Sequence, residues 1–365
     1  MKCCPSCFKD GIAKELVTTL SSPGNGLCDV CGSKTEIFLE ITPESELSEQ
    51  FADLLSVFSA VKDCRESYET LFDAFCGTWN IFDSISRDAF ERLLKSMFPA
   101  NQRIAKLLKS RVALDPSPDP KCNFALNFFG EKDWCEFAQE IKHIHRYHAT
   151  IVRRDVLRDL FNALELVVTS GGSRWFRARR WNNKSISDLS VNELKEPSEK
   201  EAKGGRMSPE GVRCLYISNN IEGAMAEIRA SKHDDIAIME MSPSRDLKIL
   251  DLSRIDRISP FDETVDCRKL ASNLINLNQI KDALVKPMRS TDDAIEYVPT
   301  QYIADFARSI GFDGIGYHSV LHERNGLPTY NIASFLGFDE AFICESISMY
   351  NVKNIHLDVG RFCTK

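Results

Sequence analysis

The sequence predicts a multidomain α+β protein in which a small cysteine-rich module, a helical bundle and a mixed α/β domain follow one another. Three observations indicate this order. Two paired-cysteine motifs stand within the first forty residues, apolar residues then recur at helical spacing, and short strand-like segments alternate with helical patterns after residue 172. Because 365 residues exceed what one compact core usually holds, we expect domains at 1–41, 42–169 and 173–365.

The bulk composition, 43% hydrophobic and 27% charged, is typical of a folded globular protein. The net charge of −7 disfavours a general binder of nucleic acid or of anionic membranes. No segment approaches the roughly 20 uninterrupted apolar residues that span a bilayer, and the first residues lack the pattern of a signal peptide. Thirteen cysteines in so long a chain indicate reduced thiols instead of a disulfide framework. We therefore expect a cytoplasmic protein without membrane partners.

The first module is marked by two Cys-x-x-Cys motifs, formed by Cys4 with Cys7 and by Cys28 with Cys31. Four thiolates at this spacing suit one tetrahedral zinc ion, because each motif supplies two ligands from a tight turn. Strand-like segments follow each motif, which predicts a zinc ribbon. A site closed by four cysteines leaves no position for a substrate, so the zinc should be structural. Cys3 could replace Cys4 as a ligand, and cysteines that are unliganded or redox active are the alternative.

Amphipathic helices dominate residues 42–169. Apolar residues recur there at helical spacing in several stretches, among them Phe51, Leu54, Leu55, Phe58 and Val61, and Ile104, Leu107, Leu108 and Val112. A proline-rich break at 115–120 separates two groups of helices, and the glycines at 171–172 end the region. Short antiparallel helices joined in this way predict a bundle with a single core.

The bundle, by its placement before the domain that follows, loosely resembles the helical HEPN-type domains of defence proteins. That family's ribonuclease motif, an arginine and a histidine separated by four to six residues, is absent from the sequence. His143, His145, Arg146 and His148 lie close together, but no acidic partner with an obvious purpose lies at helical spacing from the histidine pair, so we assign them to a solvated or partly buried helix face. We expect the bundle to sense a signal, dock a partner or form oligomers, and not to act as a nuclease.

A mixed α/β domain is predicted after residue 172. Strand patterns occur at 175–179, 214–218, 235–240, 247–252, 314–318 and 341–344, with helices between several of them. The polar run 185–205 is expected to be a mobile loop. The stretch that follows predicts a turn with Arg206, a strand with Tyr216, and a helix that is capped by Ser218 or Asn219 and presents Glu227.

Four arginines lie within residues 174–180. Alternation along a strand would put Arg177 and Arg179 on one face, where guanidinium groups can grip a pyrophosphate. Taken alone, such a run is more typical of a solvated surface or of ion pairs with acidic neighbours.

Together with this run, four further segments in a fixed order carry a family resemblance. They are the Gly-Arg turn at 205–206, the Leu-Tyr strand at 215–216, the helix with Glu227, and the segment 297–301, which leads through a helix to 314–319. In this order they resemble the RES domain, which is named for an arginine, a glutamate and a serine and occurs in bacterial toxin–antitoxin modules. The resemblance covers residues 175–347. It implies a fold similar to that of ADP-ribosyltransferase toxins and an activity that consumes NAD+.

The resemblance also implies roles for individual residues. Glu227, Ser319 and Arg177 would form the catalytic trio, and the substrate would be bound by Arg177, Arg206, Tyr216 and Tyr317. Two departures from the family pattern affect the shape of the pocket. Phe176 stands where a tyrosine often precedes the first arginine, and 207–208 is Met-Ser where an aromatic-Asn pair is more usual.

The chemistry of these residues is consistent with NAD+ cleavage. Breaking the nicotinamide N-glycosidic bond forms an oxocarbenium-like ribose, and nicotinamide leaves without a general acid, so one carboxylate can suffice. Glu227 would hold the ribose hydroxyls and stabilise the positive charge, while Ser319 would bind the substrate or orient Glu227. Arg177 and Arg206 would clamp the pyrophosphate, and Tyr216 could stack on the nicotinamide.

The sequence therefore predicts an NAD+-consuming toxin or antiphage defence effector. NAD+ would be a substrate and not a recycled cofactor, since no Gly-x-Gly-x-x-Gly follows a strand. Water, inorganic phosphate or a protein side chain could be the acceptor, which gives a glycohydrolase, a phosphorylase or an ADP-ribosyltransferase. A module that binds a nucleotide or nucleic acid without chemistry is the alternative. We expect the N-terminal half or a cognate antitoxin to restrain the activity, and homo-oligomerisation is left open.

Overall fold

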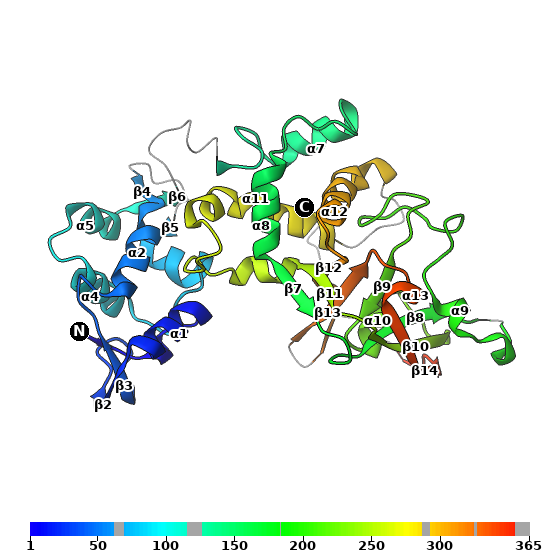
Figure 1. Ribbon diagram of the computed structural model, residues 1–365, viewed down its shortest axis with the longest axis horizontal. Coiled ribbons are helices and arrows are strands. Elements are labelled where there is room, and N and C mark those ends of the chain that lie inside the picture. The colour runs from blue at the N-terminus through cyan, green and yellow to red at the C-terminus, as the bar shows by residue number, and fades with distance from the viewer. Residues whose placement is uncertain (62–68, 115–125, 183, 287–292, 325–326, 355–365) are drawn as a thin grey trace, which may run out of the picture. The chain divides into compact units, whose positions relative to one another are not determined.

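The computed structural model describes residues 1–61, 69–114, 126–182, 184–286, 293–324 and 327–354 (Figure 1). The chain divides into two compact units, each assembled from segments that are far apart in the sequence. The first unit comprises Met1–Phe137, His148–Leu164 and Arg254–Gln279. The second comprises Ala138–Tyr147, Glu165–Ser253 and Ile280–Lys365.

The beginning of the first unit contains the cysteine pairs and a small antiparallel sheet. Its strands lie in the order β1-β3-β2 and comprise Lys2–Cys3, Lys34–Glu40 and Ser22–Leu27. The 3₁₀ turn η1 (Pro5–Cys7) follows β1, and helix α1 (Gly11–Leu20) separates the two pairs along the chain. Asp10 caps α1, because its carboxylate accepts a hydrogen bond from the Ala13 amide at 2.8 Å. The strand predicted after the second motif is confirmed as β3, whereas the first motif is followed by helix α1 and not directly by a strand.

Helices form most of the rest of the first unit. They are α2 (Glu46–Ser56), α3 (Leu71–Asp73), the π-helical η2 (Ala74–Thr78), α4 (Arg87–Met97), α5 (Gln102–Lys109), α8 (Arg154–Ala163) and the first part of α11 (Cys267–Val285). Buried phenylalanines fill the space between several of them, and the rings of Phe51 and Phe261 stack with centroids 5.3 Å apart. The segment 254–279, late in the sequence, therefore completes an early core.

Two of the predicted helical patterns end in strands. Helix α2 stops before strand β4 (Phe58–Val61), and α5 stops before β6 (Arg111–Leu114). These strands pair antiparallel, and the short β5 (Glu69–Thr70) joins β6. Apolar residues in such short segments fit a helical and a strand period equally, so the pairing partner decides their structure. The break predicted at 115–120 lies outside the described residues.

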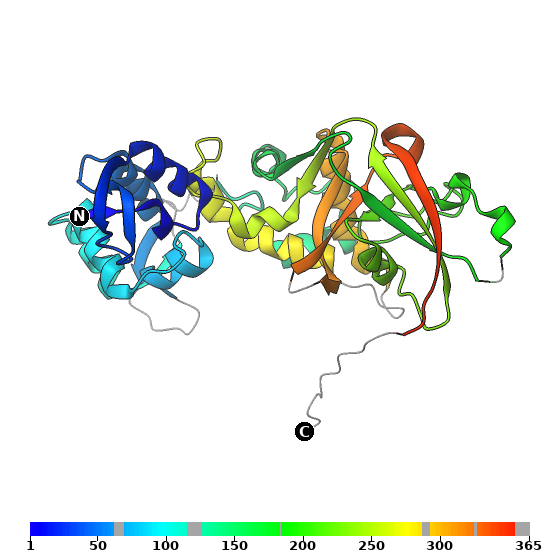
Figure 2. The same cartoon turned by 90° about the horizontal axis from the view of Figure 1, so that it is seen from below.

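The second unit is built on an eight-stranded sheet in the order β14-β10-β8-β9-β13-β12-β11-β7. Neighbours are antiparallel except β11 and β12, which are parallel. The strands are β7 (Glu165–Val168), β8 (Trp175–Arg180), β9 (Leu215–Ser218), β10 (Asp235–Pro243), β11 (Leu247–Asp251), β12 (Gly314–Arg324), β13 (Leu327–Ser334) and β14 (Phe342–Asn351). Figure 2 shows β14 in red along β10 at one edge. All six predicted strands are confirmed, whereas β7 and β13 were not predicted.

Short and long helices complete the second unit. They are η3 (Ile186–Asp188), α9 (Val191–Leu194), α10 (Ile221–Glu227), η5 (Ala294–Tyr297), α12 (Val298–Ser309) and α13 (Phe338–Ala341). Of two elements that are divided between the units, η4 (Leu252–Arg257) begins in this unit and α7 (Trp134–His143) ends in it. One core contains Leu194 of α9 together with Trp175, Ile217 and Ile332 of the sheet. A smaller core on α10 contains Ala224, Ala178 and Ile238.

Two local predictions in this unit are wrong. The segment 185–205 is not a plain loop, since it contains η3 and α9 and buries Leu194 completely. Helix α10 is capped by Asn220 and not by Ser218 or Asn219, because the Asn220 side chain accepts a hydrogen bond from the Gly223 amide at 2.7 Å. The predicted mixed α+β class is confirmed. Among the described residues, no helix has the length and apolar character needed to cross a membrane.

Candidate active site and cysteine cluster

Glu227 reaches the sheet because helix α10 packs very closely against it. A Cβ atom at Gly223 would lie 2.3 Å from Thr329 Cγ2 and 2.6 Å from Ser218 Oγ, so only glycine fits there without movement. Gly223 and Glu227 are one helical turn apart and lie on the same face of α10. The contact at Gly223 therefore fixes how near Glu227 comes to the strands.

Polar side chains form a row across the three strands beneath α10. Asn331 of β13 is opposite Ser218 of β9 on one side and opposite Tyr317 of β12 on the other. Directly opposed residues point to the same face, as do residues two positions apart, which adds Tyr216 and Ser319. The fold thus gathers hydroxyl and amide groups from β9, β12 and β13 on the face that carries α10.

The carboxylate of Glu227 is held by two of these groups. Ser319 Oγ donates a hydrogen bond to Glu227 Oε1 at 3.2 Å, and Asn331 Nδ2 donates to the same oxygen. Both donors are buried, whereas Glu227 is half-buried. Burial raises the pKa of Glu227 above its ordinary value, and the hydrogen bonds from Ser319 and Asn331 oppose that rise. The site therefore contains a partly desolvated carboxylate in a fixed orientation.

Two tyrosines stand beside this carboxylate. Burial raises the pKa of Tyr216 and of Tyr317 well above the ordinary value, and the charges of Cys214 and Glu227 add to the rise. Both phenols are consequently neutral at physiological pH. Their side chains interact with neighbouring residues, Tyr216 with Cys214 and Tyr317 with Asn331.

Arg177 connects strand β9 with the α9 segment. It comes directly after Phe176, the residue of β8 that pairs with Ser218 of β9. Its Nε donates to the Leu194 carbonyl at 2.8 Å and its Nη1 to the Tyr216 carbonyl at 3.2 Å. Burial, followed by the nearby Arg179, lowers the pKa of Arg177 to about 10, so it remains charged at neutral pH.

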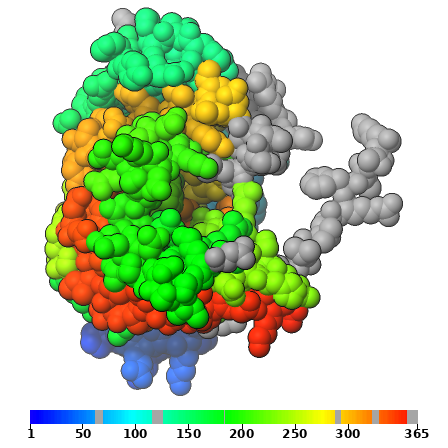
Figure 3. All heavy atoms as spheres, turned by 90° about the vertical axis from the view of Figure 1, so that its right-hand side faces the viewer, coloured from blue at the N-terminus to red at the C-terminus, as the bar shows by residue number. Residues whose placement is uncertain are grey.

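The arginines of β8 therefore fasten the α9 segment to the sheet. Arg179 lies on the same face as Arg177, as predicted, and donates to the Glu193 carbonyl. At its other end the segment contacts α13, where Lys195 forms an ion pair with Asp339 at 2.7 Å. In Figure 3 the α9 segment, in green, lies beside the red C-terminal part of the unit.

Arg206 is buried in a second set of contacts. Its Nη1 donates to the Ala283 carbonyl at 3.3 Å, and its guanidinium lies over the ring of Tyr297, 4.9 Å from the centroid. Gln301 Nε2 donates to the Gly205 carbonyl at 2.8 Å, which fixes the turn before Arg206. The predicted Gly-Arg turn and the 297–301 segment thus meet. They border a cavity of about 330 Å³ lined by Gly204, Pro209, Glu210, Tyr297, Gln301 and Arg146, among others.

The structure thus brings together one group of the predicted site residues. Glu227 and Ser319 are hydrogen-bonded, and Tyr216 and Tyr317 share their face of the sheet, whereas the bonds of Arg177 and Arg206 described above go to backbone carbonyls. Asn331 was not predicted, because it lies on β13, which has no clear strand pattern. The register of β13 between β9 and β12 is what reveals it.

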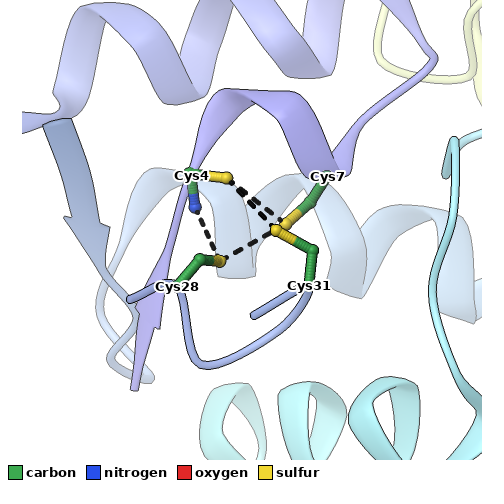
Figure 4. A group of neighbouring side chains, drawn as sticks. All are labelled: Cys4, Cys7, Cys28 and Cys31. Atoms are coloured by element: carbon green, nitrogen blue, oxygen red, sulfur yellow. Dashed lines mark hydrogen bonds between the residues drawn. The ribbon is translucent and has the colours of Figure 1, made fainter. Parts of the chain in front are cut away.

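The four predicted cysteine ligands converge at the N-terminus (Figure 4). All four sulfur atoms lie within 4.8 Å of one another, and the distances are 3.7 Å for Cys4 to Cys7, 3.6 Å for Cys4 to Cys31 and 3.5 Å for Cys7 to Cys28. Four sulfurs about 2.3 Å from a tetrahedral zinc ion would lie roughly 3.8 Å apart, so the cluster fits such an ion. The group of four includes Cys4 and not Cys3, although the Cys3 side chain also interacts with Cys7 and Cys28.

Comparison with known proteins supports part of the sequence prediction. Residues 174–342 match the family model of the RES domain. No curated protein matches the chain. Among solved structures, the MbcT–MbcA toxin–antitoxin complex of M. tuberculosis contains a similar chain with 11% sequence identity and a TM-score of 0.30, over 54% of this chain and 92% of that one. That likeness is too low to bear on function. The RES domain model thus matches the part of the chain that contains Arg177, Glu227 and Ser319.

Proposed function

We propose that this protein is an NAD+-consuming toxin or defence effector that cleaves the nicotinamide N-glycosidic bond, with Glu227 as its catalytic carboxylate. One observation carries the proposal: within the region that matches the RES domain, Glu227 is held by two buried donors above a row of polar side chains. A carboxylate with fixed orientation and partial desolvation is suited to stabilise an oxocarbenium-like ribose.

The neighbouring groups support this chemistry. Ser319 and Asn331 donate to Glu227 and favour its ionised form, which the developing positive charge requires. Tyr216 and Tyr317 are neutral and provide aromatic surface on which nicotinamide or ribose could pack. No general acid is needed, because nicotinamide leaves as a neutral base.

Arg177 and Arg206 are proposed to clamp the pyrophosphate. In the structure they donate to the carbonyls of Leu194, Tyr216 and Ala283. Phosphate oxygens are stronger acceptors than carbonyls for guanidinium groups, so substrate would have to replace these bonds. Substrate binding would therefore change the contacts of the α9 segment, since Arg177 would release the Leu194 carbonyl.

The alternative of a nucleic-acid-binding module is disfavoured by the same arginine run. Arg174 forms an ion pair with Glu240, and Arg180 forms one with Asp234 at 3.1 Å. Together with the carbonyl contacts of Arg177 and Arg179, these ion pairs give each of the four arginines an acceptor within the protein, although Arg174 and Arg180 remain exposed. A phosphate backbone would have to compete with these acceptors.

Two further parts of the proposal concern the remainder of the chain. The cysteine cluster would hold a structural zinc ion, since its four thiols leave no open ligand position. An antitoxin or the first unit would restrain the activity, because free consumption of NAD+ would harm the host.

The test is to incubate the full chain with NAD+ and follow nicotinamide release by chromatography, with and without phosphate. We expect release by the wild type and a loss of at least about 100-fold in Glu227→Gln. Glu222→Gln, an exposed carboxylate of the same helix, is the matched control and should retain activity. Mass spectrometry identifies the acceptor, because the products are ADP-ribose, its 1-phosphate or a modified protein. Absence of release by the wild type, or equal release by Glu227→Gln, would refute the proposal.

A further inference from the structure

The two hydrogen bonds to Glu227 converge on one oxygen. Ser319 Oγ and Asn331 Nδ2 both donate to Oε1, and they come from adjacent strands, β12 and β13. No hydrogen bond from the described residues is directed at Oε2. The carboxylate therefore has one oxygen bound to the protein and one oxygen available to a ligand.

Asn331 is the more constrained of the two donors. It is 1% exposed, and it lies on a central strand, opposite Ser218 on one side and Tyr317 on the other. Ser319 Oγ also accepts a hydrogen bond from the Leu321 amide at 3.2 Å, so that hydroxyl is shared between a backbone group and the carboxylate. The Asn331 side chain also interacts with Tyr317, and a planar amide with two partners sets a direction more rigidly than a hydroxyl that can rotate.

We propose that Asn331 is the positioning residue that orients Glu227, so that Oε1 is bound to the protein and Oε2 faces the ribose of the substrate. The inference rests on the proposed function for the identity of the substrate, but the contact between Asn331 and Glu227 can be tested without it. Asn331 acts through Glu227 and takes no part in bond cleavage itself.

The pH dependence of kcat distinguishes a positioning role of Asn331 from a merely structural one. The hydrogen bond from Asn331 lowers the pKa of Glu227, so its removal should move the acidic limb of kcat to higher pH. The other groups that act electrostatically on Glu227 are Tyr216 on β9, Tyr317 on β12 and Arg229 after α10. Both phenols are neutral in this range and Arg229 is the same residue in every variant, so none of the three moves the limb between variants.

Two variants separate the possibilities in the full chain. Asn331→Leu keeps the side-chain volume and removes the donor, and we expect kcat to fall about 10- to 100-fold with KM for NAD+ changed less than about threefold. Asn331→Asp places a second carboxylate beside Glu227, and we expect a larger shift of the acidic limb. Asn351→Leu, on the edge strand β14, is the control and should behave as wild type. An unchanged limb in both Asn331 variants would overturn the proposal.

A double-mutant cycle measures the contact whether or not NAD+ is cleaved. Asn331→Leu, Glu227→Gln and their combination are compared by urea unfolding at neutral pH. We expect a coupling of roughly tenfold in the unfolding equilibrium constant, as for a hydrogen bond to a charged group. Coupling without nicotinamide release would refute the proposed function and leave the Asn331 contact supported. Additive effects would refute the positioning role even if wild type releases nicotinamide.

Discussion

Substitution of Gly223 by alanine should displace Glu227 without changing the side chain of Glu227 or of its donors Ser319 and Asn331. The added Cβ would lie 2.3 Å from Thr329 Cγ2, 2.6 Å from Ser218 Oγ and 3.1 Å from Asn220 Oδ1. Ordinary contacts of this kind begin near 3.4 Å, so relief requires that α10 moves about 1 Å away from the sheet. The Thr329 methyl and the Ser218 hydroxyl lie on β13 and β9, so the strain acts directly on the strands beneath the site.

The expected change in stability follows from two opposing free-energy terms, and the expected loss of activity follows from one distance. Overpacking of this kind costs about 1–3 kcal/mol, and alanine in place of glycine in a helix returns about 1 kcal/mol, so the free energy of unfolding should fall by roughly 0–2 kcal/mol. The hydrogen bond from Ser319 to Glu227 is already 3.2 Å long and would not survive a shift of about 1 Å. A misplacement of this size costs about 100-fold in rate, so activity should fall far more than stability.

The assay combines nicotinamide release with urea unfolding of the same preparations. Thr329→Ser removes Cγ2 and keeps Oγ1, which accepts a hydrogen bond from Asn220 at 3.0 Å, so it should restore part of the activity to Gly223→Ala. Gly11→Ala is the matched control, since its Cβ would meet nothing within 4 Å at the start of helix α1. Full activity in Gly223→Ala, or no rescue by Thr329→Ser, would contradict the geometry described for α10.

Two further predictions concern the metal and the carboxylate. Purified protein should contain one zinc ion per chain, and Cys28→Ser or a strong chelator should remove the ion and lower the Tm. Cys3→Ser is the control and should keep the zinc. Elemental analysis that finds no zinc, or loss of the metal in Cys3→Ser, would contradict the assignment. Burial raises the pKa of Glu227 in the folded state, so the protonated form of this residue stabilises the fold. This stabilisation is complete below the pKa of the unfolded state, near 4.5, and is lost as the pH rises through the pKa of the folded state. Glu227→Gln should therefore gain stability relative to wild type as pH rises through that window, and a difference in unfolding free energy that is independent of pH would refute the shift.

The parts of the site that the sequence predicted are those with local patterns. Glu227 lies on a helix that follows a clear strand, and Ser319 continues a strand that begins with Gly314, so both could be placed from neighbouring residues. Asn331 could not, because its strand contains a proline and alternates poorly, and only pairing with β9 and β12 defines it. Arg177 was placed correctly on its strand, but no local pattern indicated that its donors meet the carbonyls of α9.

The same reasoning applies to the rest of the fold. The strands β4 and β6 were predicted as helix, because a short apolar run takes its structure from a partner that lies more than 45 residues away. The role of segment 254–279 in the first unit depends on tertiary packing of Phe261 against Phe51. Periodicity cannot report such a contact, since it describes only neighbours along the chain.

The order in which the site residues occur along the chain has a consequence for protein synthesis. Ser319 and Asn331 follow Glu227 by 92 and 104 positions. A ribosome that has made the helix with Glu227 must add about a hundred residues before either donor exists, which takes several seconds or more at about 5–20 residues per second. The nascent chain therefore has no assembled site until β12 and β13 have been made and paired. For a protein proposed to destroy NAD+, this delay gives an inhibitor time to meet the growing chain before it can act.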